Sequence, residues 1–215
     1  MNPMNRKRGF TLIELLIVIA IIAILATVVI LALNPAELLR EARDSNRVSD
    51  AATLKSSIAL YLADQSSPSM GTSTECFTSS PGSTFYTPSA TGTWGSATAC
   101  TAWFQTAASI NNSTARGVDG TGWLPIPFNK ISSGSPMGSL PIDPINQVGT
   151  CTGTSPALST CGLFYSYITN SSNQYKIGMF MESAKYTSGS GNVETDTYDG
   201  GINNYVYETG NDLAL

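Results

Sequence analysis

The order of apolar and polar positions along this chain of 215 residues changes sharply after residue 33. Residues 15–33 form an unbroken apolar run in which no residue is charged and Thr27 carries the only hydroxyl. A helix over 10–33 would measure about 36 Å at about 1.5 Å per residue, and a hydrocarbon core is about 30 Å thick. The pattern therefore predicts a hydrophobic half-helix over 10–34 that can cross a membrane.

The next segment, 35–65, follows helical periodicity instead of continuous apolarity. Asn34-Pro35 indicates a kink or a short break, because the residue before a proline avoids helical angles. Arg40 and Asp44 are four residues apart and are expected to interact weakly on an exposed face. The segment is predicted to be an amphipathic half-helix. Its apolar positions are Leu38, Ala42, Val48, Ala52, Ile58 and Leu62.

The remaining residues, 66–215, predict a globular head. Residues 66–162 are low in charge and rich in Ser, Thr, Gly and Pro, yet they contain three tryptophans, which is too aromatic for simple disorder. We expect them to form a long, variable, loop-rich insertion, with a short helix at 102–110. Residues 163–215 are expected to hold the sheet and a C-terminal loop.

Three segments of the head have strand patterns. Residues 174–182 alternate apolar and polar side chains, which indicates a half-buried strand. A turn at 170–173 would join this strand to one at 163–169, and a third strand is expected at 205–208. The predicted fold class is α+β: a long N-terminal helix packed on an antiparallel sheet of three or four strands.

Glu14 changes the interpretation of the apolar run. A carboxylate inside such a segment costs about 2.5–3.5 kcal/mol at mid-membrane and less near the interface, so it indicates a function. A secretory signal peptide has a shorter apolar core of about 7–15 residues, and a plain membrane anchor leaves Glu14 unexplained. The basic cluster at 6–8 keeps the N-terminus cytoplasmic and the head outside.

The N-terminal segment resembles the signal sequence of type IV prepilins and type II secretion pseudopilins. The resemblance rests on Gly9, Phe10 and Glu14, followed by an unbroken apolar helix. It implies the pilin fold, a leader at 1–9 that a prepilin peptidase cuts after Gly9, and N-methylation of the new N-terminus at Phe10. It also implies that Glu14 pairs with the amino group of a neighbouring subunit during filament assembly.

The same resemblance implies a structural role rather than catalysis. The subunit would span the inner membrane, reach a pilus assembly platform, and join a helical homo-oligomeric filament outside the cell. Within the family, the long insertion at 66–162 favours a type IV pilus subunit. Pro141-Ile142-Asp143-Pro144 resembles a segment of the pseudopilin-like branch, so a type II secretion pseudopilin is an alternative. A minor pilin that binds DNA or a surface is another.

The charge balance argues against a general nucleic-acid binder. The net charge is −4 and the isoelectric point is about 4.7. After Lys55 only four basic residues follow, which form no basic stripe. Stacking of single-stranded DNA on Trp94, Trp103 or Trp123 stays open, with buried packing as the ordinary alternative for these side chains.

The chain contains four cysteines and no histidine. The cysteine spacing is unlike that of a zinc site, and an exported chain favours disulfides. Sequential pairing, Cys76–Cys100 and Cys151–Cys161, closes the shortest loops; crossed pairs and free thiols are the alternatives.

Without histidine, a Ser-His or Cys-His nucleophile pair cannot form. No phosphate-binding glycine motif is found either, so we do not expect an enzyme.

An acidic loop at 192–204 is the one candidate for a metal. Some pseudopilins bind calcium in this loop, and Asp196, Asp199 and Asn203 offer the oxygen ligands that calcium prefers. A solvated turn is favoured, because Asp and Asn also suit turn geometry. We therefore expect no cofactor, with calcium as the alternative.

Overall fold

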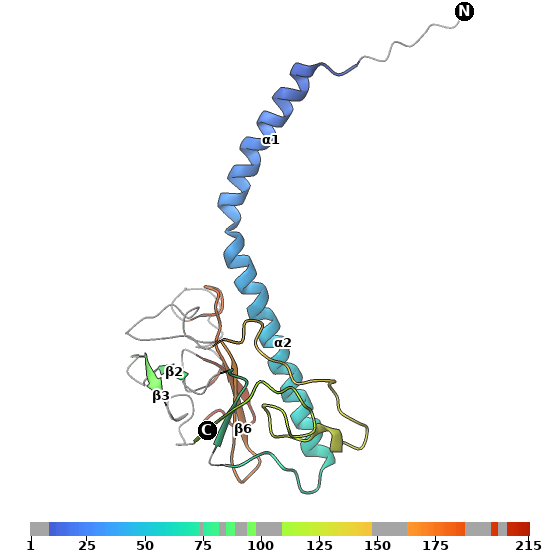
Figure 1. Cartoon of the computed structure of the whole chain (residues 1–215), viewed down its shortest axis with the longest axis vertical. Coiled ribbons are helices and arrows are strands. Elements are labelled where there is room, and N and C mark those ends of the chain that lie inside the picture. Colours follow the sequence, from blue (N-terminus) through green and yellow to red (C-terminus); the bar gives the residue numbers. More distant parts are fainter. Residues whose placement is uncertain are drawn as a thin grey trace, which may run out of the picture. The chain divides into compact units, whose positions relative to one another are not determined.

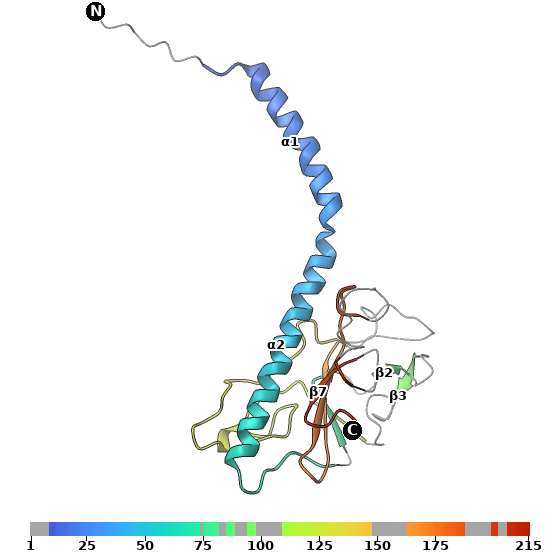
Figure 2. The same cartoon turned by 180° about the vertical axis from the view of Figure 1, so that it is seen from behind.

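The computed structural model of the protein describes most of the chain. It places residues 9–73, 75–81, 85–88, 94–97, 109–147, 163–187, 199–201 and 206–215. The chain divides into two compact units, Met1–Leu39 and Arg40–Leu215, and each is described by itself below. Figures 1 and 2 show the course of the chain from opposite sides.

The N-terminal unit contains helix α1, Leu12–Leu33. By length and composition its stretch Leu12–Ile30 can cross a membrane, and none of this stretch is buried. The helix ends at Asn34, whose φ of 40° lies in the left-handed region, and Pro35 begins the next helix. The break expected from the Asn34-Pro35 sequence is therefore present.

Helix α2, Pro35–Asp64, carries the buried face that the head packs against. The expected apolar face was partly wrong. Ile58 is buried and Val48 and Leu62 are half-buried, but Leu38, Ala42 and Ala52 are exposed. The buried face of α2 differs from the expected one because, toward the N-terminus of the helix, it contains the charged side chains of Asp44 and Arg47. The buried residues of α2 are Asp44, Arg47, Ala51, Leu54, Ser57, Ile58 and Tyr61.

The main sheet has five strands in the order β4-β1-β5-β6-β7. β1 and β4 are parallel, and the other neighbours are antiparallel. The expected purely antiparallel sheet of three or four strands was wrong, because the insertion contributes β1 and β4. The strands are β1 (Glu75–Thr78), β4 (Ser109–Asn112), β5 (Tyr165–Thr169), β6 (Tyr175–Met179) and β7 (Tyr207–Gly210).

The insertion is more regular than the sequence suggested. β2 (Phe85–Pro88) and β3 (Trp94–Ala97) pair as a separate antiparallel two-stranded sheet. The helix expected at 102–110 overlaps β4 at its end, and residues 101–108 lie outside the described residues. The parallel β1–β4 pair could not be found by periodicity, since each strand has only four residues.

The β5–β6 hairpin is confirmed, with the Asn170 N–H donating to the Gln174 carbonyl across the turn at 3.0 Å. The half-buried alternation expected for β6 was wrong, since Lys176 and Gly178 are buried as well as their apolar neighbours. β7 begins two residues later than expected, at Tyr207.

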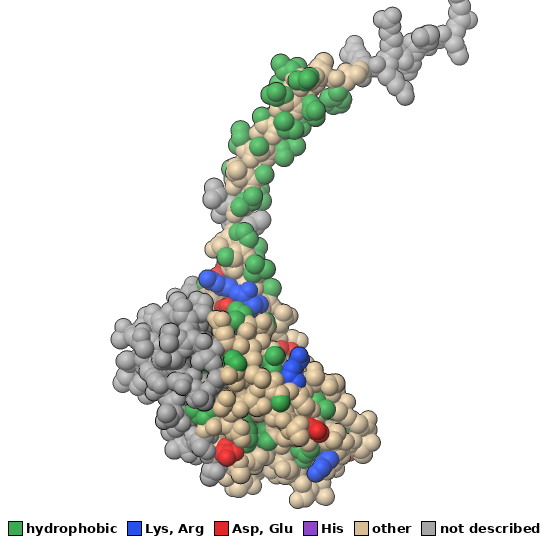
Figure 3. Space-filling view, in the orientation of Figure 1, with side chains coloured by type: hydrophobic (Ala, Val, Ile, Leu, Met, Phe, Trp, Pro, Cys, Tyr) green, Lys and Arg blue, Asp and Glu red, His purple; other side chains and the backbone are tan. Residues whose placement is uncertain are grey.

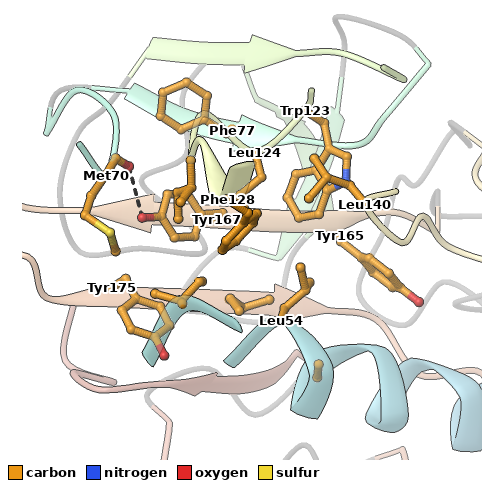
Figure 4. Packing of buried hydrophobic residues seen from close by; sticks show 14 of the residues in the cluster. Leu54, Met70, Phe77, Trp123, Leu124, Phe128, Leu140, Tyr165, Tyr167 and Tyr175 are labelled. Carbon is orange, nitrogen blue, oxygen red and sulfur yellow. Dashed lines mark hydrogen bonds between the residues drawn. The ribbon is translucent and has the colours of Figure 1, made fainter. Parts of the chain in front are cut away.

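The core of the head lies between α2, the sheet and the segment 123–140. Figure 4 shows Leu54 of α2 together with Tyr165 and Tyr167 of β5. Trp123 is 1% exposed, and its indole N–H donates to the Pro141 carbonyl at 2.9 Å. Trp123 therefore cannot serve as a stacking platform for DNA. The side chains of Trp94 and Trp103 lie outside the described residues.

Candidate functional site

The first turn of α1 contains a capping box that joins Thr11 and Glu14. The Thr11 backbone N–H and hydroxyl both donate to Oε2 of Glu14, at 2.8 and 2.7 Å. The Glu14 N–H donates to the Thr11 hydroxyl at 3.3 Å. Such reciprocal bonds satisfy backbone donors that the start of a helix leaves open. Thr11 was missed in the sequence, although the spacing Thr-x-x-Glu is the signal of this motif.

This arrangement explains how a carboxylate is accommodated beside an apolar helix. The side chain of Glu14 accepts two hydrogen bonds from its own chain, and a helix N-terminus favours negative charge. The three predicted residues Gly9, Phe10 and Glu14 lie together at this end of the chain and are all exposed. A side chain at Gly9 would meet nothing within 4 Å, so its backbone is open to approach.

The apolar side chains of α1 have no cover among the described residues. Phe10 is 86% exposed and Leu12 is 82% exposed, and the side chains from Ile13 to Ile30 follow the same pattern. Figure 3 shows hydrophobic side chains gathered along the visible face of α1, whereas on the coloured part of the head they are scattered. An apolar surface this large marks a membrane or a protein interface.

A second cluster of functional-type side chains lies inside the head, around Arg47. This guanidinium is fully buried and binds both oxygens of Asp143, at 2.6 and 2.9 Å. It also donates to Asp44 and to Glu182, each at 2.7 Å. The planar guanidinium suits this fork-like pairing. One arginine thus joins α2 to two other segments.

The remaining bonds of the cluster satisfy its carboxylates. The carboxylate of Asp44 accepts the backbone N–H groups of Glu182 and Ser183 and the hydroxyl of Ser183. Arg43 reaches both oxygens of Glu182, at 2.7 and 3.1 Å. Burial opposes the ionisation of Glu182, but the bonds from Arg43 and Arg47 prevail and lower its pKa.

The expected position of Asp44 on an exposed face of the helix was therefore wrong. Asp44 is fully buried, and Arg47, three residues away on the helix, donates to it. No local sequence pattern indicates this burial, because the partners Asp143 and Glu182 are far along the chain. We define these five side chains as the ionic cluster: Arg43, Asp44, Arg47, Asp143 and Glu182.

The predicted cysteines and metal ligands are only partly described. Cys76 is buried on β1 and takes part in a disulfide bond. Its predicted pairing, and that of the second pair, stay predictions, because Cys100, Cys151 and Cys161 lie outside the described residues.

The calcium prediction falls mostly outside the described residues as well, since Asp196 and Asn203 are not among them. Asp199 is placed, and burial raises its pKa to about 6. Within the described part of the chain, no group of three or more His, Cys, Asp or Glu side chains could hold a metal ion.

Comparison with known proteins identifies the N-terminal segment. Residues 4–30 match the family model described as the prokaryotic N-terminal methylation motif, which is the prepilin-type signal of type IV pilins and pseudopilins. The motif and the α+β fold support a type IV pilin or pseudopilin-like protein, processed by a prepilin peptidase and anchored in a membrane before assembly. No curated protein and no solved structure matches the chain.

Proposed function

We propose that this protein is the structural subunit of a type IV pilus. It is made as a prepilin, cleaved after Gly9, methylated on the amino group of Phe10, and assembled through α1. The observation that carries the proposal is the uncovered apolar surface of α1, which begins at a capped Glu14 inside the methylation motif. This surface needs lipid before assembly and neighbouring helices afterwards.

Cleavage would change the charge at the start of α1. Removal of residues 1–9 takes away the basic cluster at 6–8 and places a positive amino group on Phe10. That group and the Glu14 carboxylate of a neighbouring subunit are complementary charges. A buried charge without a partner is costly, so their pairing sets the stagger at which a subunit enters the filament. Glu14 reaches this step already oriented by Thr11.

The long insertion supports a pilus rather than a secretion pseudopilus. It contributes two strands to the main sheet and forms the β2–β3 pair. A module of this size suits a subunit whose head faces the medium. The second candidate is a type II secretion pseudopilin, which is favoured by the resemblance of Pro141–Pro144 to a segment of the pseudopilin-like branch. In the structure Asp143 of this segment is bound to α2 through Arg47.

The intact mass and N-terminal sequence of the protein from its own cells test the processing step. A chain that starts at Phe10 and carries one extra methyl group supports the proposal. A chain that starts at Met1 or beyond Leu33 overturns it, because neither product is a processed prepilin.

A second experiment separates the two candidates. Deletion of the gene should remove surface filaments, seen by electron microscopy of sheared material, and leave protein secretion intact. Loss of secretion with unchanged surface filaments would instead assign the chain to a secretion pseudopilus.

A further inference from the structure

Two stretches of the head match the acceptor sequence of N-glycosylation, Asn-x-Ser/Thr, in which x is not proline. One is Asn111-Asn112-Ser113-Thr114, which contains two overlapping acceptor sequences. The other is Asn170-Ser171-Ser172. A sequence this short also arises by chance, so the place of each asparagine in the fold has to decide which of them can accept a sugar.

Asn170 is held inside the turn between β5 and β6. Its side-chain oxygen accepts the backbone N–H groups of Ser172 and Gln174, at 2.9 and 3.0 Å. Its side-chain nitrogen, the atom that would carry a sugar, donates to the side chain of Gln174 at 2.6 Å. A sugar on this nitrogen would displace Gln174 and take a donor from the turn, so the folded turn disfavours Asn170 as an acceptor.

The side chain of Asn111 on β4 is in a different setting. It is exposed, and no hydrogen bond engages its amide group among the residues that the structure describes. Asn112 is half-buried, and as the next residue of the strand it points to the opposite face of the sheet. The chain after β4 stays exposed at Thr114 and Ala115. Asn111 is therefore the acceptor asparagine whose nitrogen is most open to a transferase.

The strand that carries Asn111 is one whose edge a glycan could cover. β4 is an end strand in the order of the main sheet, and among the described strands it pairs with β1 alone. An edge strand presents backbone groups to which a strand of another chain can add, and proteins often protect such edges with charged side chains. Residues 109–115 contain no charge. A bulky, hydrated glycan on this strand would give the same protection.

We propose that Asn111 is an N-glycosylation site. The sugar donor is a lipid-linked oligosaccharide on the outer side of the membrane. The bond between the anomeric carbon of the sugar and the lipid phosphate breaks, and the anomeric carbon forms a bond to Nδ2 of Asn111. The lipid phosphate leaves with the electron pair of the broken bond, and Nδ2 gives one proton to a base of the transferase.

This inference rests on the proposed function in one respect. The head has to be exported, because only then do Asn111 and the lipid-linked donor meet on the same side of the membrane. Pilus assembly itself is not required, so the glycan and the filament can be tested separately.

The test is the intact mass of the full-length protein from its own cells, with proteolytic mapping of the peptide that contains Asn111. The wild-type chain should carry a sugar on this residue, and Asn111→Gln should lose the extra mass completely. Ser113→Ala should lose it too, because it removes the hydroxyl of the acceptor sequence and keeps Asn111. Ser113→Thr keeps a hydroxyl at this position and should retain the sugar.

Two variants are the matched controls. Thr114→Ala removes the overlapping acceptor sequence of Asn112 and leaves that of Asn111 complete, so the extra mass should stay. Asn170→Gln removes the acceptor whose amide is engaged in the turn, and the extra mass should stay there as well.

Three outcomes would overturn the inference. One is an Asn111 peptide without added mass in the wild-type chain. Another is extra mass that persists in Asn111→Gln, because the sugar is then O-linked or carried by another asparagine. The third is loss of the extra mass in Thr114→Ala, which assigns the sugar to Asn112.

The N-terminus found in the same measurement tests the proposed function separately. A chain that starts at Phe10 and has no sugar on Asn111 overturns the glycosylation site and leaves the processing of a prepilin supported. A chain that starts at Met1 and carries the sugar has the opposite meaning, because it is exported and glycosylated but is not a processed prepilin.

Discussion

The guanidinium of Arg47 holds both carboxylate oxygens of Asp143, although 96 positions separate the two residues in the chain. Asp143 also accepts the backbone N–H groups of Ile145 and Asn146, at 2.9 and 3.2 Å. The same carboxylate therefore shapes its own turn and fixes that turn to α2. The position of the turn at 143–146 relative to α2 thus depends on one buried arginine.

Replacement of Arg47 by methionine should destabilise the head strongly. Removal of one partner from a buried ion pair costs about 3–5 kcal/mol, because the other charges stay buried without a partner. Here Asp44, Asp143 and Glu182 would all lose a donor. Chemical denaturation of the full-length chain in detergent, followed by tryptophan fluorescence, measures the loss.

Arg43→Met is the matched control, because the Arg43 side chain is 30% exposed and donates, among the residues that the structure describes, to Glu182. Its cost should be clearly smaller than that of Arg47→Met. Equal losses for the two variants would contradict a special role for Arg47.

The ionic cluster should also make stability depend on acid. The pKa of Glu182 is lowered from 4.5 in the folded chain, so the folded state favours the ionised form. The contribution of Glu182 to the free energy of unfolding is present above about pH 4.5, and it is lost as the pH falls through the lowered pKa. The unmodified chain should therefore exceed Glu182→Gln in thermal midpoint near neutral pH, and the gap should shrink below pH 4.5. A gap that does not change with pH would show that the charge of Glu182 is not the cause.

The helices and the later strands could be predicted from the sequence because their signals are local. The apolar run that becomes α1, the break at Asn34-Pro35 and the turn at 170–173 each depend on neighbouring residues. The same holds for Gly9, Phe10 and Glu14, whose spacing carries the methylation motif.

The ionic cluster and the mixed sheet could not be predicted in this way. The local sequence predicts that Arg47 is a charge on the solvent-facing side of a helix. Its burial depends on Asp143 and Glu182, which only the folded chain brings next to it. Likewise the parallel pairing of β1 with β4 depends on a register between two short strands separated by a long segment. The alternation of the strand predicts an exposed Lys176, whereas the fold buries it with its ammonium 2.9 Å from Glu208 of β7.

Replacement of Glu14 by alanine should block filament assembly and leave processing intact. The cleavage site precedes Phe10, so the peptidase should still remove the leader and the new N-terminus should still be methylated. Without the carboxylate, the amino group of an entering subunit finds no partner in the apolar core. Immunoblots of sheared filaments and membranes, with intact mass of the membrane fraction, test this. Normal filament yield would favour a chain that is merely anchored and exported.

Replacement of Thr11 by valine should give a weaker form of the same defect. Valine keeps the size of the side chain but removes the hydroxyl that donates to Glu14 at 2.7 Å and accepts its N–H. Loss of such a cap costs about 0.5–2 kcal/mol of helix stability, and it also frees the Glu14 side chain to turn away from the position needed for pairing. Filament yield should fall by less than in Glu14→Ala, with cleavage and methylation unchanged.

Thr27→Val is the matched control for that variant. It removes the other hydroxyl of the helix, which donates to the Ile24 carbonyl at 2.8 Å, far from Glu14 in the sequence. Both variants make α1 more apolar by the same change, so a general effect of hydrophobicity on membrane release would lower filament yield equally. A defect confined to Thr11→Val would instead assign the effect to the orientation of Glu14, because this contact is what distinguishes the two threonines.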